Sequence, residues 1–152
     1  MTRIGVIGGS GFNMSSQFSA IKQFNSKTKF GDPSSDLFEM ESNGLYFYFL
    51  FRHGDPHRIP PHLVNYRANL SALSSHGVEI VVAINSVGAI SESISIGQLV
   101  IPDQLIDYTW GREHTIATTG EIESMHELCV DHAVRCEQSG RTGALRWRVS
   151  SR

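Results

Sequence analysis

Short apolar runs separated by glycine and proline predict several strands along the first part of the chain. The stretch RIGVIGGSGF (residues 3–12) is an apolar run that ends in glycines, which is typical of a buried strand leaving through a tight turn. The stretch VEIVVAI (78–84) is β-branched and lacks polar alternation, as expected of a strand covered on both faces. A third run, QLVIPDQLID (98–107), predicts another strand with a bend at Pro102.

A hairpin and a helix are predicted between the first two of these runs. Residues 36–51 indicate two strands joined at Asn43 and Gly44, because Asn-Gly supplies the positive φ angles of a type I′ turn. Beyond the hairpin the apolar residues follow a helical period, and Gly77 can supply the left-handed position at the helix end. The residues at helical spacing are Leu63, Tyr66, Leu70 and Leu73.

Two stretches do not fit this alternation of strand and helix. Residues 13–36 are polar and irregular, and from about residue 116 the charges are scattered, with five late arginines and little apolar periodicity. Residues 124–137 are compatible with a helix, whereas the end of the chain is expected to be unstructured. The order of the elements predicts an α/β fold with a mixed, largely parallel central sheet flanked by helices and incomplete at its C-terminal end.

Composition narrows the class of protein. At 152 residues the chain is one domain or an incomplete piece of one, and 40% hydrophobic residues suffice for a core. A net charge of −2 gives no basic footprint for nucleic acid. The first residues are too short an apolar run for a signal peptide or a membrane span. Two cysteines, Cys129 and Cys136, suit a reducing compartment, so we expect a cytoplasmic protein without nucleic-acid or membrane partners.

The glycine turn after the first strand is a candidate anion site. In Gly8-Gly9-Ser10-Gly11 the backbone N–H groups and the Ser10 hydroxyl can bind an oxyanion. Taken alone, the cluster is better explained by a plain tight turn. It is not a dinucleotide fingerprint, because Met14 occupies the third glycine position, and no Gly-Lys-Ser/Thr follows it as in a P-loop.

A second candidate, Arg52-His53-Gly54, directly follows the second hairpin strand. Arginine offers a fork of donors that matches phosphate oxygens, and histidine adds a further donor or a cation. The plainer alternative is an arginine paired with a surface carboxylate. Histidine phosphatases also place Arg-His-Gly after a strand and phosphorylate the histidine, but there the motif lies near the N-terminus on the first strand.

A third candidate, Asn85-Ser86, follows the buried strand at 78–84. Ligands of open α/β sheets collect at the carboxyl ends of strands. If the strands are parallel, Ser10, Arg52 with His53, and Asn85 with Ser86 therefore meet at one edge of the sheet. The joint pattern is a stronger signal than any of its parts.

Other histidines and the cysteines carry weaker signals. His57 and His62 flank a proline pair, and either can orient the loop, line a pocket or lie in solvent; a structural role is favoured for His62 and His57 stays open. His76 is expected to interact with the helix dipole. One straight helix cannot wrap a tetrahedral metal site, so no metal is predicted for the cluster His126, Cys129, His132 and Cys136.

Four ordered motifs give a resemblance to a known family. They are IGVIGGSGF, then FRHG followed by His57 and PPHLVNYRANLSAL, then INSVGAI, and finally GQLVIPDQLIDYTWGREHT. With these the sequence resembles the purine nucleoside phosphorylase superfamily, and within it the methylthioadenosine and S-methyl-5′-thioinosine phosphorylase branch. The resemblance covers about residues 3–115. We therefore expect residues 1–115 to be the N-terminal part of a nucleoside phosphorylase domain and 116–152 to be a divergent tail, left by truncation or a frameshift.

The resemblance implies a function and roles for the candidate residues. Ser10, Arg52 and His53 would bind inorganic phosphate, with Arg52 and His53 positioning it for attack, and Asn85 and Ser86 would contact phosphate and nucleoside. The implied reaction splits a 5′-methylthionucleoside, with S-methyl-5′-thioinosine favoured by the fourth motif. It gives a purine base and 5-methylthioribose 1-phosphate without metal or organic cofactor, in a homotrimer when full length.

Two alternatives stay open beside this implied function. One is a non-catalytic truncated fragment that at most binds phosphate, and the other is a histidine phosphatase-like enzyme that uses His53. The preference for a 6-oxo or a 6-amino purine would depend on a C-terminal half that has no counterpart here.

Overall fold

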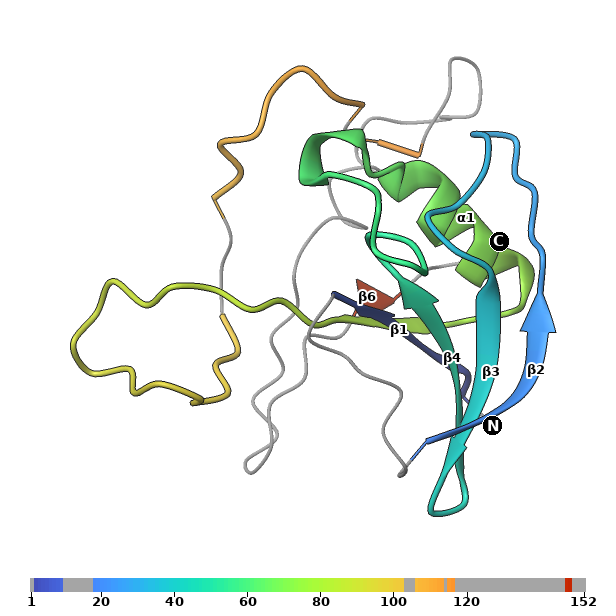
Figure 1. Cartoon of the computed structure of the whole chain (residues 1–152), viewed down its shortest axis with the longest axis horizontal. Coiled ribbons are helices and arrows are strands. Elements are labelled where there is room, and N and C mark those ends of the chain that lie inside the picture. The colour runs from blue at the N-terminus through green and yellow to red at the C-terminus, as the bar shows by residue number, and fades with distance from the viewer. Residues whose placement is uncertain (1, 10–17, 103–105, 114, 117–146, 149–152) are drawn as a thin grey trace.

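A computed structural model describes residues 2–9, 18–102, 106–113, 115–116 and 147–148. In this part of the chain, six strands form one mixed sheet in the order β2-β3-β4-β1-β5-β6, and one α-helix lies on one of its faces (Figure 1). The elements are β1 (Ile4–Gly8), β2 (Ser19–Phe24), β3 (Leu37–Ser42), β4 (Leu45–Phe51), a 3₁₀ helix η1 (Pro61–Leu63), α1 (Tyr66–Ser75), β5 (Ile80–Ala83) and β6 (Trp147–Arg148).

The first strand of the chain, β1, lies in the middle of this sheet. It pairs in parallel with β4 on one side and with β5 on the other, whereas β2–β3, β3–β4 and β5–β6 are antiparallel. The predicted mixed α/β fold is therefore confirmed. Because β1, β4 and β5 run in the same direction, their carboxyl ends meet at one edge of the sheet.

The predicted hairpin is present as β3 and β4. Asn43 and Gly44 join the two strands with φ angles of 51° and 80°, and Ser42 pairs with Leu45 across the turn. Positive φ at both central residues is what a type I′ turn requires. The Glu41 carboxylate accepts a hydrogen bond from the Gly44 amide at 2.7 Å, which adds a side-chain tie to the backbone turn.

The layer between α1 and the sheet holds the larger of two apolar clusters. Leu73 of α1 is fully buried against strand residues that point to the same face. Gly5 of β1 allows this approach, since a Cβ there would lie 2.9 Å from Leu73 Cδ2. The buried members of the cluster are Ile7, Leu37, Leu50, Leu73, Val78 and Val81.

The opposite face of the sheet carries the second cluster. Met40 and Phe49 are fully buried there, and Phe47 is nearly so. Phe49 and Phe51, two residues apart on β4, meet edge to face with centroids 4.8 Å apart. Successive residues of β4 thus alternate between the two faces, as the pleat of a strand requires.

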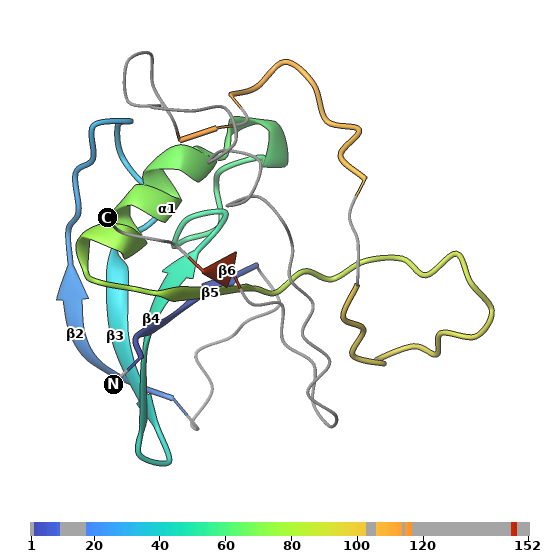
Figure 2. The same cartoon turned by 180° about the vertical axis from the view of Figure 1, so that it is seen from behind.

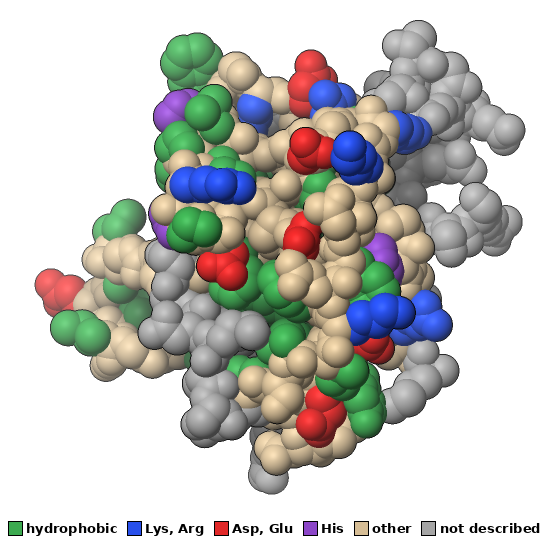
Figure 3. All heavy atoms as spheres, turned by 45° about the vertical axis from the view of Figure 1, so that its right-hand side comes forward, with side chains coloured by type: hydrophobic (Ala, Val, Ile, Leu, Met, Phe, Trp, Pro, Cys, Tyr) green, Lys and Arg blue, Asp and Glu red, His purple; other side chains and the backbone are tan. Residues whose placement is uncertain are grey.

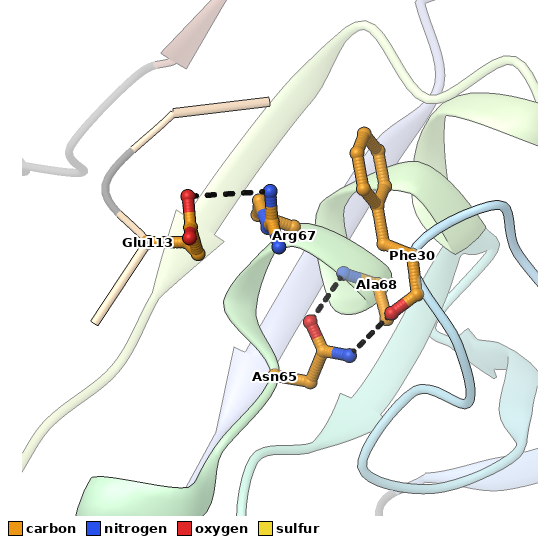
Figure 4. A network of polar contacts seen from close by, with 5 residues as sticks. All are labelled: Phe30, Asn65, Arg67, Ala68 and Glu113. Atoms are coloured by element: carbon orange, nitrogen blue, oxygen red, sulfur yellow. Dashed lines mark hydrogen bonds and ion pairs between the residues drawn. The ribbon is translucent and has the colours of Figure 1, made fainter. Parts of the chain in front are cut away.

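Two asparagines fix α1 to the loop before β3. Asn65 caps the helix by accepting a hydrogen bond from the Ala68 amide at 3.1 Å, and its amide donates to the Phe30 carbonyl at 2.7 Å (Figure 4). Asn69 is fully buried; it accepts from the Ser34 amide at 2.7 Å and donates to the Ser34 hydroxyl at 3.0 Å.

The predicted helix is confirmed, but its buried face differs from the predicted one. Leu73 is buried, whereas Leu63 lies in η1 and is 65% exposed. Ala68 and Ala72, both fully buried, take the helix positions closest to the sheet. Small side chains allow close packing of the helix there, and counting only large apolar residues overlooked them.

Two strands lie where the sequence predicted irregular structure. β2 falls within residues 13–36; it is an edge strand with mostly exposed residues, and a bulge interrupts its pairing between Ala20 and Lys22. An edge strand of this kind lacks the apolar pattern by which strands are recognised. β6 falls in the end expected to be unstructured, where Trp147 and Arg148 pair with Val81 and Ile80.

The strand predicted at 98–107 is wrong for its described residues. Residues 98–102 are not in a strand, and 103–105 lie outside the described residues, as do 124–137. An apolar run becomes a strand only where a neighbouring strand offers hydrogen-bonding groups. The outer edge of β5 is occupied instead by β6.

After β5 the chain leaves the sheet as what we call the outer segment, residues 84–102. It extends away from the sheet in both views (Figures 1 and 2), and hydrophobic side chains lie on the surface of this protruding part in Figure 3. Ile90 and Ile96 are fully exposed, and Val87 is 83% exposed. Elsewhere on the face in Figure 3, charges of both signs are interspersed. Of the described residues, none belongs to a helix long and apolar enough to cross a membrane.

Residues 106–113 return to the start of α1. Glu113 lies 3.6 Å from the Arg67 guanidinium (Figure 4), and Arg112 lies over the ring of Tyr66 at 5.3 Å. The Glu113 side chain is 71% exposed, so this ion pair contributes about 0–1 kcal/mol.

Candidate functional site

Three strand ends meet at the carboxyl edge of the sheet. Gly8 of β1 pairs with Phe51 of β4, and Ile7 pairs with Ala83 of β5. The ladder continues one step further on both sides, since the Arg52 amide donates to the Gly8 carbonyl at 2.8 Å and the Ile84 amide donates to the Ile7 carbonyl at 2.9 Å. Gly9, Arg52 and Ile84 therefore come side by side immediately beyond the strands.

The Arg52 side chain lies across this junction. Its Nη1 donates to the Ile84 carbonyl at 3.2 Å and its Nε donates to His53 Nε2 at 3.3 Å. Gly9 lies directly beneath the guanidinium: a Cβ at Gly9 would be 2.7 Å from Arg52 Nη2. The glycine turn after β1 thus leaves the space that the guanidinium occupies.

Among the described residues, most of the donor capacity of Arg52 has no acceptor. A guanidinium has five N–H donors, and the two bonds to Ile84 and His53 use two of them. Among the residues that the structure describes, no carboxylate pairs with Arg52. The surface ion pair considered as the plainer alternative is therefore not formed within this part of the chain. A partly buried cation with free donors is suited to hold an oxyanion.

Hydrogen bonds at both ring nitrogens determine the tautomer of His53. Nδ1 lies 2.9 Å from the Ile59 carbonyl, which can only accept, so Nδ1 carries the proton. Nε2 accepts from the Arg52 Nε–H group at 3.3 Å and is therefore unprotonated. His53 is a neutral Nδ1–H imidazole whose other nitrogen faces the guanidinium.

The loop of residues 53–59 folds back onto His53. The His53 carbonyl accepts from the amides of Arg58 and Ile59, both at 2.9 Å. Gly54 is buried with φ of 84°, and a Cβ there would lie 3.2 Å from the Ser34 carbonyl. The loop therefore requires glycine both for its backbone conformation and for its packing.

Within this loop His57 stacks on His53. The ring centroids are 4.7 Å apart and the ring planes differ by 24°. His62, in η1, is exposed, and His76 caps α1, with Nδ1 2.9 Å from the Ala72 carbonyl and its ring against Phe24.

The other predicted site residues are only partly placed. Asn85 and Ser86 follow Ile84 directly and are exposed, and neither side chain has a hydrogen bond to another described residue. Ser10 lies outside the described residues, directly after Gly9. The cluster at 126–136 also lies outside them, and in the part of the chain that is described no three histidine, cysteine or acidic side chains gather as a metal site would require.

A polar cavity of about 280 Å³ lies on the other side of the loop. It is lined by Asp55 and Arg58 of the loop and by Asp36, whose carboxylate accepts from Gln23 at 2.6 Å and from Asn25 at 2.9 Å. Neither Arg52 nor His53 lines it. The cavity is therefore separate from the junction of the three strands.

Sequence reasoning missed two features of this site. The Ile84 carbonyl orients Arg52, but a backbone acceptor leaves no trace in the sequence. The stack of His57 on His53 had a weak signal, namely two histidines four residues apart around a loop that contains Gly54 and Pro56.

Comparison with known proteins shows relatives of about twice the length. A probable S-methyl-5′-thioinosine phosphorylase of Xylella fastidiosa is 43% identical over 123 residues, which cover 81% of this chain and 50% of that protein. An S-methyl-5′-thioadenosine phosphorylase of Hyperthermus butylicus is 38% identical over 151 residues, covering 98% of this chain and 55% of that protein. The chain thus spans about half the length of the curated relatives it matches.

Solved structures and a family model agree with these relatives. The methylthioadenosine phosphorylase from Schistosoma mansoni in complex with adenine superposes with a TM-score of 0.70 at 40% identity, over 76% of this chain and 42% of that one. The model of the phosphorylase superfamily matches residues 3–142. Because this range runs past residue 115, the boundary expected there stays a prediction. The resemblance inferred from the four motifs is confirmed, and the chain belongs to the phosphorylase superfamily.

Proposed function

We propose that this chain carries the phosphate site of a nucleoside phosphorylase that acts on 5′-methylthionucleosides. The observation that carries the proposal is the junction of three parallel strand ends, where Arg52 keeps free donors beside Gly9 and His53. Membership of the superfamily supports inorganic phosphate as the anion held there. Ser10, Asn85 and Ser86, which follow the ends of β1 and β5, complete the proposed site.

The chemistry of phosphorolysis explains why such a site is needed. Phosphate is the nucleophile, and it must be held beneath the anomeric carbon while the bond to the purine breaks. Positive charge develops on the sugar in the transition state, so a bound phosphate also stabilises it electrostatically. Arg52 would hold the phosphate oxygens and His53 would fix the orientation of Arg52. The base leaves with the electrons of the glycosidic bond, and the pentose 1-phosphate forms.

S-Methyl-5′-thioinosine is the proposed substrate within this class. The support is the DQLIDYTWGREHT stretch (103–115) and the similarity to the probable methylthioinosine phosphorylase of Xylella fastidiosa. Methylthioadenosine is the competing substrate, supported by the similarity to the Hyperthermus butylicus protein. Parallel assays with the two nucleosides and inorganic phosphate, following release of hypoxanthine or adenine, distinguish them. Release of adenine alone would reject the methylthioinosine assignment.

A second candidate is a chain that binds phosphate without catalysis. It requires only the junction at Arg52, which the described residues contain. Titration with inorganic phosphate, followed by calorimetry, tests binding separately from turnover. Binding without base release from either nucleoside favours this candidate, whereas no binding at all contradicts both.

The histidine phosphatase alternative makes a different chemical prediction. It requires a phosphohistidine at His53 and hydrolysis of phosphomonoesters without a nucleoside. Incubation with a chromogenic phosphomonoester, followed by mass spectrometry of the intact chain, tests it. We expect neither product release nor a mass increase of one phosphoryl group.

A further inference from the structure

The ring of His53 is held at its edges but needs a third contact to fix its orientation. Its Nδ1–H bonds the Ile59 carbonyl and its Nε2 accepts from Arg52. Both bonds are made at ring nitrogens, so on their own they leave the ring able to tilt about the line that joins these two atoms. A group packed on the ring face opposes this tilt.

His57 supplies that face contact. Its ring stacks on His53 at 4.7 Å with an angle of 24° between the planes. The His57 side chain is exposed, and its ring nitrogens have no hydrogen bond to another residue in the described ranges. Within the described residues, the stack on His53 is therefore the contact through which the His57 ring can influence the site.

The backbone brings the two rings together without help from a ligand. The His53 carbonyl binds the amides of Arg58 and Ile59, and Gly54 supplies the positive φ that turns the chain back. His57 is thereby placed over the ring that precedes it by four residues.

We propose that His57 is a positioning residue for His53. Its ring holds the His53 ring in the orientation in which Nδ1–H reaches the Ile59 carbonyl and Nε2 accepts from Arg52, so that imidazole and guanidinium meet the anion as one oriented unit. This inference rests on the proposed phosphate site. It assigns His57 no contact with phosphate and no proton transfer.

The experiment compares His57→Ala with His57→Phe, which keeps an aromatic face but has no ring nitrogen. His62→Ala is the matched control, because His62 is also exposed and lies five residues further along. The first readout is the pair of ¹⁵N shifts of the His53 ring in phosphate-free buffer, at a pH well above the ordinary imidazole pKa of about 6.5. The second is the affinity for inorganic phosphate, titrated on the same signals.

We expect His57→Ala to mix the two His53 tautomers and to weaken phosphate binding about threefold to tenfold, the range of one stacked aromatic pair. His57→Phe should restore both readouts, and His62→Ala should change neither. A backbone amide spectrum verifies the fold of each variant. Where His57→Ala does not fold, His57→Leu gives the same comparison, because it fills the space without an aromatic face.

Two results would overturn the proposal. One is a His57→Ala, or His57→Leu, variant with unchanged tautomer and unchanged affinity. The other is a His57→Phe variant that binds phosphate as weakly as the alanine variant while the His53 tautomer is intact, which would make His57 itself a ligand. If the unaltered chain binds no phosphate, the proposed function fails, and the tautomer comparison still decides the role of His57.

Discussion

The layer between α1 and the sheet differs from the rim where β1, β4 and β5 end. In the layer, Leu73 is closed off from solvent and the one buried amide, Asn69, has both polar atoms bonded. At the rim, Arg52 is partly exposed and keeps donors in reserve. Strand β1 leads from one region to the other: its Gly5 lies in the layer, and Gly9 follows the end of the strand at the rim. The contrast separates the residues that stabilise the fold from the residues that can bind a ligand.

The largest effect is expected in the layer, from Leu73→Ala. Removing a fully buried leucine costs the transfer free energy of its lost atoms and leaves a cavity, together about 2–5 kcal/mol of the free energy of unfolding. Urea denaturation measures the loss. Leu63→Ala is the control, because Leu63 is 65% exposed and should change stability by less than about 0.5 kcal/mol. Equal losses in the two variants would contradict the packing described.

At the rim, Arg52→Ala should reduce phosphate binding rather than stability. Loss of a charge-assisted contact costs about 1.5–3 kcal/mol, or roughly tenfold to more than a hundredfold in affinity. Arg52→Lys should recover part of it, since an ammonium keeps the charge but not the planar fork. Calorimetric titration with inorganic phosphate gives the affinities. If Arg52→Ala binds phosphate unchanged, Arg52 is not part of the site.

Asn69→Ala tests whether the buried Asn69 amide stabilises the fold. It leaves the amide and hydroxyl of Ser34 without their partner, at a cost of about 1–3 kcal/mol in unfolding free energy. Combining it with Ser34→Ala in a double-mutant cycle isolates the coupling between the two residues. Because Ser34→Ala keeps its backbone amide, a coupling energy near zero would mean that the bond between the Asn69 amide and the Ser34 hydroxyl contributes nothing net.

The smallest effect is expected from Gly9→Ala, just beyond the end of β1, and Gly5→Ala within β1 gives the sharpest contrast to it. Gly9→Ala would bring a Cβ to 2.7 Å from Arg52 Nη2, which can swing aside, so we expect a loss of about 0.5–1.5 kcal/mol in phosphate binding with little change in stability. Gly5→Ala instead meets Leu73 Cδ2 at 2.9 Å inside the layer and should lower stability by about 1–3 kcal/mol. If Gly9→Ala instead lowered stability and Gly5→Ala weakened phosphate binding, the division between a stabilising layer and a binding rim would be wrong.

Elements with a strong local pattern were predictable from the sequence. The run before Gly8, the β-branched run at 78–84 and the Asn43-Gly44 turn each carry their own signal, and all three form as predicted. The site followed from them, because parallel strands bring their ends together once their direction is known. Hence Arg52 and His53 could be expected beside the ends of β1 and β5, where they lie, whereas their role in binding phosphate stays a prediction.

Features that depend on distant partners were not predictable. β2 forms because β3 offers an edge to a mostly polar strand, and residues 98–102 fail to form one although their apolar pattern is stronger. Asn69 resembles any polar helix residue until Ser34, 35 positions earlier, is seen beside it. A local sequence pattern indicates only the propensity for a strand or a buried position. Whether the strand forms, or the polar residue is buried, depends on the strand edge or the hydrogen-bond partner that the fold brings beside it.

The central position of β1 has a consequence for the order of folding during synthesis. This strand leaves the ribosome before both its neighbours, and the second of them ends only at Ala83. At about 5–20 residues per second, the interval from Gly8 to Ala83 lasts about 4–15 s. During that time β1 is apolar and part of its backbone N–H and C=O groups are unpaired, so strands of other nascent chains can pair with it. We therefore expect the yield of folded chain to rise when translation is accelerated or chaperones are supplied in excess.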